Sequence, residues 1–379
     1  MDDECCDVAI VGGGPAGAAA AFALARAGRH VVVFERAAMP RDKVCGDLLG
    51  TDAIAQLHAI GFTQDVIAAG HGLDGAVLHG PGGERFGAVA SAPARDGVAA
   101  PRAFVVRRQT FDAALLGSAR TAGASVRFEA AIDLARDTAG RIVGVRTAAN
   151  SVRARATILA DGWSSLALRE LGTARRDDRN VAVATRAYAR GVRGLGARMH
   201  FFINPRGNGY GWIFPLGNGE ANAGLGYLRA EETIDLPSAW ARFVGAGSFA
   251  APFLREAWVA SPRTWPIPIG PSRGPVSAPG LFVAGDAATL ASPISGSGIA
   301  SALASGAAAA TFARRALDGD EGAWHAYGAW VRRHVVRRLK IEAFAHAAFG
   351  TPGAFARVSP LMRFPGVDAR LSHALLALG

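Results

Sequence analysis

The segment from Asp7 to Arg36 constrains the fold more than any other stretch of the sequence. It reads DVAIVGGGPAGAAAAFALARAGRHVVVFER: an apolar run, three glycines in GxGxxG spacing, an Ala-rich stretch and a second apolar run that ends in an acid. This order predicts a strand, a tight turn, a helix and a parallel strand. Pro15 agrees with the helix start, because proline suits the first helical turn.

The glycines and the acid each have a physical role in binding a dinucleotide. Gly12 permits the sharp turn, Gly14 lets the backbone approach a pyrophosphate, and Gly17 lets the helix lie against the sheet, with the phosphates at the helix N-terminus. Glu35 can accept hydrogen bonds from ribose hydroxyls. Because the strand, the helix and the acid all surround the glycines, the segment indicates a dinucleotide site and not an ordinary Gly-rich turn.

Composition and charge narrow the classes of protein further. The chain has 379 residues, half of them apolar, which is enough for two domains. The net charge is +10, yet the cations are almost all arginines scattered along the chain, with Lys43 and Lys340 as the only lysines. No basic arm or RNA-binding signature accompanies them, so no nucleic-acid partner is expected. A basic surface instead suits an anionic membrane leaflet, an acidic carrier protein or the phosphate of NADPH.

The cysteines and the chain start bear on compartment. Cys5, Cys6 and Cys45 have neither CxxC spacing nor a His cluster nearby, so no disulfide framework and no metal site is predicted. The acidic MDDECC start does not resemble a signal peptide, and no stretch of about twenty apolar residues exists. We expect a cytoplasmic protein that rests, at most, on the inner face of the membrane.

The chain is expected to leave the nucleotide-binding domain, build a second domain and return. Strand-like segments separated by Gly207-Asn208-Gly209 and Gly217-Asn218-Gly219 are typical of antiparallel sheet. We expect the nucleotide-binding domain over 1–75, 102–180 and 270–320, an antiparallel substrate domain over 76–101 and 181–269, and a helical segment over 321–379. The last segment carries a basic stretch, read as a solvated helix face or as a face that docks on a membrane or carrier: Arg332, Arg333, Arg337, Arg338 and Lys340.

Two further motifs identify the cofactor. Asp161 and Gly162 follow an apolar strand and give a tight turn beside a pyrophosphate, and Gly285 and Asp286 end another strand where a carboxylate could hold a ribityl hydroxyl. A nicotinamide dehydrogenase needs only the GxGxxG segment. The three motifs together therefore favour FAD.

These motifs resemble those of flavoproteins with the para-hydroxybenzoate hydroxylase fold. The likeness rests on GGGPAG, Arg108-x-x-Phe111-Asp112, ADG at 160–162 and GDAA at 285–288. It implies a mixed α/β chain with a discontinuous Rossmann-like FAD-binding domain, an inserted antiparallel sheet and a C-terminal helical region. It also implies that Arg108 and Asp161 lie near the pyrophosphate and Asp286 near the ribityl chain. The full set of expected cofactor-binding residues is Gly12, Gly14, Pro15, Ala16, Gly17, Glu35, Arg36, Cys45, Gly46, Arg108, Asp161, Gly162, Gly285, Asp286, Pro293, Gly296 and Gly298.

Two other stretches point to a subfamily. DKVCGD at 42–47 and YGWIFP at 210–215 resemble the geranylgeranyl reductase family, including its menaquinone-reductase-like members. Those enzymes use reduced FAD to saturate isoprenoid double bonds. Aromatic hydroxylases of the same fold usually read GDAAH and later carry an Asn, whereas this chain has Thr289 and Ala300 at those places.

Several residues are candidates for contact with substrate or flavin. Tyr210, Trp212 and Phe214 would share one face of a strand, where they form either an apolar wall for a greasy substrate or simply the core face of a sheet. Cys45 is either a proton donor or substrate positioner at the flavin, or a buried small residue. Backbone N–H groups around Gly296 and Gly298 would approach the flavin's pyrimidine end.

The sequence thus predicts an FAD-dependent oxidoreductase that reduces a carbon–carbon double bond in a hydrophobic, isoprenoid-like substrate. Hydride would come from the flavin N5 and the proton from Cys45 or Tyr210, with Trp212 the third expected catalytic residue. The electron donor is open between NAD(P)H and another reductant. One alternative is an FAD-dependent monooxygenase or oxidative tailoring enzyme that acts on an aromatic or carrier-bound substrate. Another is a non-catalytic flavin-binding subunit.

Overall fold

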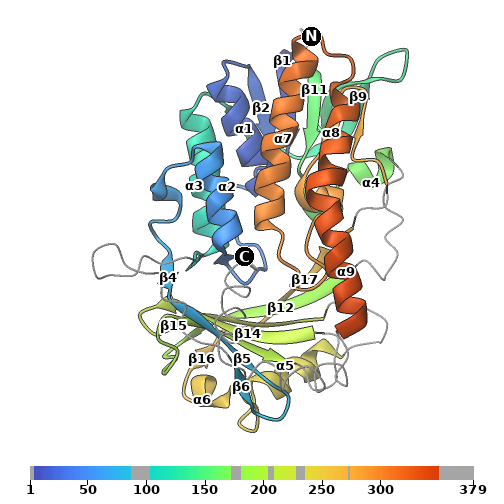
Figure 1. Cartoon of the computed structure of the whole chain (residues 1–379). Coiled ribbons are helices and arrows are strands. Elements are labelled where there is room, and N and C mark those ends of the chain that lie inside the picture. Colours follow the sequence, from blue (N-terminus) through green and yellow to red (C-terminus); the bar gives the residue numbers. More distant parts are fainter. Residues whose placement is uncertain are drawn as a thin grey trace, which may run out of the picture.

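The computed structural model describes residues 4–86, 103–171, 181–203, 209–227, 235–271 and 274–349. Within them, two large sheets lie one above the other, and helices cover the upper sheet (Figure 1). The predicted mixed α/β fold, with an antiparallel sheet inserted into a Rossmann-like unit and helices near the C-terminus, is confirmed.

The first sheet has the strand order β18-β19-β11-β1-β2-β8, with β10 paired to β11 and β9 paired to β10. Its strands are β1 (Glu4–Val11), β2 (Val31–Phe34), β8 (Ser125–Arg127), β9 (Ala131–Arg136), β10 (Ile142–Thr147), β11 (Ser151–Leu159), β18 (Ser277–Ala278) and β19 (Leu281–Val283). The central strand β1 runs parallel to both neighbours, so that Val8 lies opposite Val31 and Ala156. All four residues of β2 are buried, as expected of a parallel strand covered on both faces.

Helices α1 (Pro15–Arg26), α3 (Arg108–Thr121) and α7 (Ile299–Leu317) pack side by side over this sheet (Figure 1). The predicted strand, turn, helix and strand of the opening segment are therefore confirmed. Gly17 shows why the helix can lie so close, because a Cβ added there would stand 1.8 Å from the carbonyl oxygen of Gly12. Helix α2 (Thr51–Ile60) also contacts α7, and the short α4 (Ala167–Glu170) lies near the sheet edge.

The second sheet lies below and has the order β16-β12-β15-β14-β13-β5-β6, with β17 also paired to β12. Its strands are β5 (Gly75–His79), β6 (Arg85–Phe86), β12 (Val181–Arg190), β13 (Arg198–Ile203), β14 (Gly209–Gly217), β15 (Glu220–Tyr227), β16 (Trp258–Val259) and β17 (Arg263–Pro268). All its pairs are antiparallel except β13 with β5. The predicted turn at Gly217-Asn218-Gly219 joins β14 to β15, with positive φ angles of 85°, 51° and 73°. The other predicted turn includes Gly207 and Asn208, which lie outside the described residues.

Helices α5 (Leu236–Val244) and α6 (Ala251–Leu254) cover the lower face of this second sheet. A third sheet of three short strands stands between the two large ones: β3 (Leu48–Leu49), β7 (Ala103–Val105) and β4 (His71–Leu73). Leu48 and Leu49 directly follow the DKVCGD segment and pair with β7.

The chain continues through α8 (Ala323–Val331), a π-helical turn (Arg332–Val336) and α9 (Arg337–Phe349). The cations of the basic stretch are exposed, as both a solvated face and a docking face require, while Val335, Val336 and Leu339 on the same segment are buried. Among the described residues, no helix combines the length and the apolar character needed to cross a bilayer.

Candidate functional site

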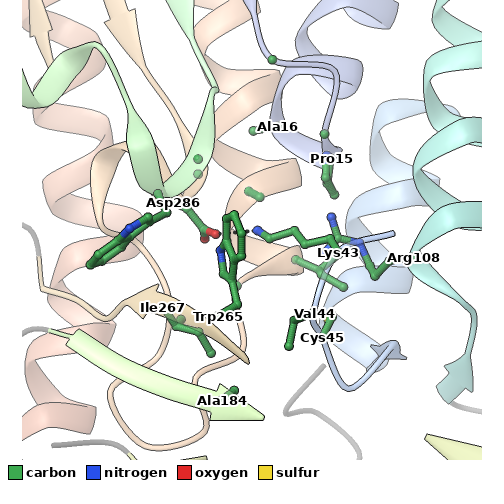
Figure 2. Close-up of a pocket in the computed structure, with 18 of the residues that line it drawn as sticks. Pro15, Ala16, Lys43, Val44, Cys45, Arg108, Ala184, Trp265, Ile267 and Asp286 are labelled. Carbon is green, nitrogen blue, oxygen red and sulfur yellow. Dashed lines mark hydrogen bonds and ion pairs between the residues drawn. The ribbon is translucent and has the colours of Figure 1, made fainter. Parts of the chain in front are cut away.

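A pocket of about 480 Å³ lies between the first and second sheets. Its walls come from segments far apart in the chain: the glycine turn after β1, the 41–48 loop, the start of α3, the turn after β11, strands β12, β14 and β17, and the stretch from Gly285 to Ala302. Figure 2 shows how these segments converge. All the sequence-predicted site residues line this pocket except Gly17 and Pro293.

The glycine turn forms the end of the pocket where a pyrophosphate would be held. Gly12 has a φ of 99°, and Gly14 is the N-cap of α1. A Cβ added to Gly14 would find only the Arg41 guanidinium within 4 Å, at 3.6 Å, and one added to Gly162 would find nothing. Gly14 therefore leaves space at the N-terminus of a 12-residue helix, which is the cradle a dinucleotide phosphate requires. Gly162 leaves space in the turn after β11.

Glu35 is fixed at the pocket wall by contacts with the glycine turn and with Arg41. Its carboxylate is 5% exposed and accepts hydrogen bonds from the backbone N–H groups of Gly13 (2.9 Å) and Ala37 (3.1 Å). Arg41 bridges Glu35 (3.3 Å) and Asp112 (3.0 Å), so the acid is fixed from two sides. The neighbouring Arg36 donates to Ser164 Oγ at 3.2 Å. These contacts orient Glu35 at the pocket wall, and its role toward a ribose stays a prediction.

Arg108 is almost fully buried at the start of α3. It forms a bidentate pair with Asp112, with both N–O distances at 2.7 Å. Burial alone would lower its pKa, but the Asp112 carboxylate and a hydrogen bond to the Cys45 sulfur hold the pKa above its usual range. The guanidinium therefore stays charged beside Cys45. Its predicted contact with a pyrophosphate stays a prediction.

The carboxylate of Asp161 accepts hydrogen bonds from residues of its own turn. It accepts hydrogen bonds from Ser165 Oγ (2.5 Å) and from the Leu166 N–H (2.8 Å). Burial raises its pKa above the usual range. The acid thus stabilises the turn after β11, while Gly162, with a φ of 74°, is the part of that turn that opens toward the pocket.

Asp286 faces Lys43 across the pocket. The Lys43 ammonium donates to Asp286 Oδ2 at 2.8 Å, and Figure 2 shows this contact as a dashed line. Burial alone would raise the pKa of Asp286, but the Lys43 ammonium holds it below its usual range. The contact ties the 42–47 loop to the Gly285-Asp286 turn. The two residues lie 243 positions apart, and no sequence pattern pairs them.

The DKVCGD loop is anchored at its far end by a buried carboxylate. Asp47 is fully buried with a positive φ of 62°, and its Oδ2 accepts from Tyr188 Oη (2.8 Å) and Asn222 Nδ2 (2.9 Å). Burial raises the pKa of Asp47 to about 6, although the Arg186 charge and the two hydrogen bonds oppose this shift. The loop is therefore attached to strands β12 and β15 of the second sheet.

Asn222 is the centre of this attachment. Besides Asp47, its Nδ2 donates to the Cys45 carbonyl oxygen (2.8 Å), and its Oδ1 accepts from Trp212 Nε1 (2.9 Å). Arg186 adds hydrogen bonds to Asp42 (2.6 Å) and to the Lys43 carbonyl oxygen (3.1 Å). Sequence reasoning missed Asn222, Arg186 and Tyr188. The one available signal was the occurrence of such polar residues inside apolar strand patterns.

The three aromatic residues of β14 do share one face, as predicted. Neighbouring ring centroids are 5.9 Å apart for Tyr210 and Trp212 and 6.2 Å apart for Trp212 and Phe214. Trp212 packs closely on β15, where a Cβ added to Gly224 would stand 2.1 Å from the indole ring. The Tyr210 hydroxyl donates to the Ser295 carbonyl oxygen at 2.5 Å. This face is both the core face of a sheet and a wall of the pocket, so both interpretations given from the sequence hold.

The 293–298 stretch differs in part from the prediction. Pro293 is buried and does not line the pocket, and the Gly296 N–H already donates to the Ser292 carbonyl oxygen at 2.9 Å. Gly298 is the N-cap of α7, whose first turn borders the pocket. The Gly296 N–H is already used within its own turn. Of the N–H groups predicted to face the flavin, those at the start of α7 therefore stay as candidates.

Comparison with known proteins supports the same cofactor. A family model described as an FAD binding domain matches residues 5–235. The chain is 36% identical to a menaquinone reductase of Mycolicibacterium smegmatis, over 80% of this chain and 75% of that protein. It is 33% identical to digeranylgeranylglycerophospholipid reductase 2 of Methanopyrus kandleri, over 83% of this chain and 78% of that protein.

Solved structures confirm the fold. A geranylgeranyl bacteriochlorophyll reductase-like protein of Thermoplasma acidophilum superposes with a TM-score of 0.80 at 24% identity, covering 99% of this chain and 90% of that one. Flavin-dependent halogenases share the fold as well. The likeness to these structures extends to the fold alone, but the sequence relatives carry the classification further. The chain therefore belongs to the geranylgeranyl reductase family of FAD-dependent oxidoreductases, as its DKVCGD and YGWIFP segments predict.

Proposed function

We propose that the protein reduces a carbon–carbon double bond in a hydrophobic, isoprenoid-like substrate. The observation that carries the proposal is the meeting of three features in one pocket: the dinucleotide-binding glycines, Cys45 in its loop and the aromatic face of β14. The sequence relatives named menaquinone reductase and digeranylgeranylglycerophospholipid reductase support a substrate of this class.

The chain's own residues fit FAD. Gly12, Gly14 and the N-terminus of α1 would hold the pyrophosphate, Glu35 the adenosine ribose and Asp286 the ribityl chain. Bound in its reduced form, the cofactor would supply a hydride from the flavin N5. Replacement of Asp286 by Ala is expected to weaken FAD binding, and full flavin occupancy in that variant would remove the assignment.

Cys45 is the better proton donor of the two candidates. Burial raises the pKa of Tyr210 well above its usual value, and its hydroxyl already donates to the Ser295 carbonyl oxygen. Cys45 lies instead at the pocket wall, beside the charged Arg108 guanidinium. The Trp212 N–H is bonded to Asn222, so Trp212 acts as a wall and not as an acid.

The reaction would add a hydride and a proton across the double bond, and two electrons would leave the reduced cofactor. The aromatic face would hold the alkene by apolar contact, since neither Trp212 nor Tyr210 has its polar atom available. The electron donor, NAD(P)H or another reductant, is to be identified by assay.

We also propose the domain boundaries that the sequence predicts. For the exposed cations of the π-helical turn and α9, we propose contact with an anionic membrane surface or carrier.

The experiment is a single turnover without oxygen. Holoenzyme reduced with dithionite is mixed with a menaquinone-type substrate that carries an unsaturated side chain, and the product is then exposed to air and weighed by mass spectrometry. Air returns any quinol to quinone, so a product that stays heavier by two hydrogens has a reduced side chain. Replacement of Cys45 by Ala should slow this step about 100-fold, whereas replacement of the exposed Cys5 by Ala should not.

Two outcomes would contradict the proposal. Recovery of the substrate unchanged in mass would exclude reduction of the double bond. Incorporation of labelled oxygen into an aromatic substrate, coupled to NADPH consumption in air, would establish the monooxygenase alternative. Equal rates for the Cys45 and Cys5 variants would leave the reaction in place but remove Cys45 as its acid.

A further inference from the structure

Trp265 lies in the pocket wall opposite the glycine turn. It belongs to β17, where it pairs with Ala184 of β12, and both residues line the pocket. In Figure 2 its ring points away from Ile267 and Ala184 toward the Lys43–Asp286 pair. The residue thus stands between the second sheet and the part of the pocket that borders Asp286.

Among the aromatic residues discussed for the pocket wall, Trp212 and Tyr210 have hydrogen-bond partners for their polar groups, and within the described part of the chain Trp265 does not. Trp212 Nε1 donates to Asn222 and the Tyr210 hydroxyl to Ser295. Trp265 Nε1 is buried, and no acceptor for it occurs among the described residues. An indole N–H can only donate, and a buried donor without an acceptor costs about 1 to 3 kcal/mol. Such a group at a pocket wall calls for an acceptor on the molecule that enters.

The charges nearby restrict what that acceptor can be. Arg263 lies two residues before Trp265 on the same strand and is paired with Asp42 at 2.7 Å. Lys43 is paired with Asp286 at 2.8 Å. Both cations near this side chain are therefore neutralised, and Ile267 and Ala184 add apolar surface. The surroundings suit a neutral oxygen on an apolar group better than a phosphate or a carboxylate.

We propose that Trp265 Nε1 donates a hydrogen bond to a carbonyl oxygen on the head group of the substrate, and so selects a ketone- or quinone-type molecule over a plain hydrocarbon. Trp265 is then a specificity-determining residue of the pocket. The inference rests on the proposed function for the existence of a polyprenyl substrate. Its own content is the polar contact, which can be measured without turnover.

The test is binding to the oxidised holoenzyme by isothermal titration calorimetry. One ligand is a naphthoquinone with a short prenyl chain, and the other is the same prenylated naphthalene without the two carbonyl oxygens. The wild-type protein should bind the quinone about tenfold more tightly than its carbonyl-free analogue, because only the quinone pairs the indole N–H. Trp265→Phe keeps an aromatic ring and removes the donor, so this preference should largely vanish.

The matched control is Trp258→Phe. Trp258 is 60% exposed on the edge strand β16 and does not line the pocket. This variant should keep the wild-type preference, and melting curves should report that both variants are folded. A preference unchanged in Trp265→Phe would overturn the inference. So would an equal loss for both ligands, or a fall in FAD occupancy without a selective effect, since the N–H would then serve packing or the cofactor. Selective binding without side-chain reduction would contradict the proposed function alone.

Discussion

The two faces of the second sheet bury polar groups in opposite ways. On the face toward the pocket, Asn222 and Asp47 form hydrogen bonds that join the sheet to the DKVCGD loop. On the other face, His79 Nε2 and His200 Nδ1 are 2.9 Å apart and the rings lie among Phe202 and Phe253. The first arrangement pairs the side chains of Asn222 and Asp47 across two parts of the chain. The second leaves His200 Nε2 without a partner among the described residues.

This difference indicates what each face of the sheet contributes to the pocket and to stability. Strand residues alternate between the faces, so His200 and Phe202 point one way while Phe201 points the other. On the pocket face, a chain of hydrogen bonds positions Cys45 and Trp212. Loss of these hydrogen bonds should alter both the geometry of the pocket and the stability of the protein. The far face positions nothing in the pocket. It should affect stability alone, and it should do so with a strong dependence on pH.

The largest effect is expected from Asn222→Leu. The change removes hydrogen bonds to Trp212, Cys45 and Asp47 together and leaves a buried carboxylate with one partner fewer. We expect the free energy of unfolding to fall by about 3 kcal/mol, with weaker FAD retention. Urea denaturation measures the first effect and absorbance of the bound flavin the second. Asn150→Ala is the control, because the Asn150 hydrogen bonds use backbone atoms. Equal stabilities would show that the network does not hold the loop.

A smaller loss is expected from Gly224→Ala. A Cβ at this position would stand 2.1 Å from the Trp212 ring, so the indole must move. Overpacking of this kind costs about 1 to 3 kcal/mol. At Gly226 on the same strand the nearest atom would be 3.7 Å away, an ordinary contact, so Gly226→Ala serves as the matched control. Thermal unfolding of the two variants side by side decides the point. A Gly226 variant that loses as much would remove the assignment to Trp212.

A pH dependence of stability is expected from the far face. Burial lowers the pKa of His79 to about 4 and that of His200 to about 3, while Arg85 and Arg198 add to the shift. The unfolded chain takes up these protons near pH 6.5. Stability from this pair is therefore complete above that pH and falls as the pH drops toward 4, by about 1 to 2 kcal/mol per histidine at pH 5.

Asp47 on the pocket face titrates with the opposite sign. Its raised pKa means that the folded chain binds a proton near pH 6, before the unfolded chain does, so its contribution improves as the pH falls. The comparison of the two faces can therefore be sharpened with His79→Gln, which should flatten the loss between pH 7 and pH 5. Chemical denaturation at both pH values measures it. An unchanged slope in that variant would assign the pH dependence elsewhere.

Much of the first sheet could be predicted from sequence because its signals are local. The turn, helix and strands from Val8 to Phe34 follow from glycine spacing and apolar runs. The contacts that shape the site are not local. Asn222 and Asp47 lie 175 positions apart, and Lys43 and Asp286 lie 243 apart. No spacing rule connects such pairs, since their meeting depends on how the two sheets stack.

The aromatic face was predictable for the same reason as the opening segment, because alternation along one strand fixes it. The role of Trp265 was not, because an unpaired N–H appears only once every neighbouring acceptor is placed. The histidine pair likewise joins β5 to β13 across 121 positions. Sequence patterns thus predicted the elements and the cofactor, while the polar pairing between elements required the structure.

The most direct test of the central claim follows the flavin itself. Reduced holoenzyme is mixed, without oxygen, with a prenylated hydroquinone, whose ring is already reduced and cannot oxidise the flavin. The side chain of this ligand is either unsaturated or fully saturated, and the absorbance band of oxidised flavin is recorded in a stopped-flow instrument. If the protein reduces the side chain, the band returns with the unsaturated ligand and stays absent with the saturated one. A band that returns equally with both, or only when air is admitted, would contradict the account.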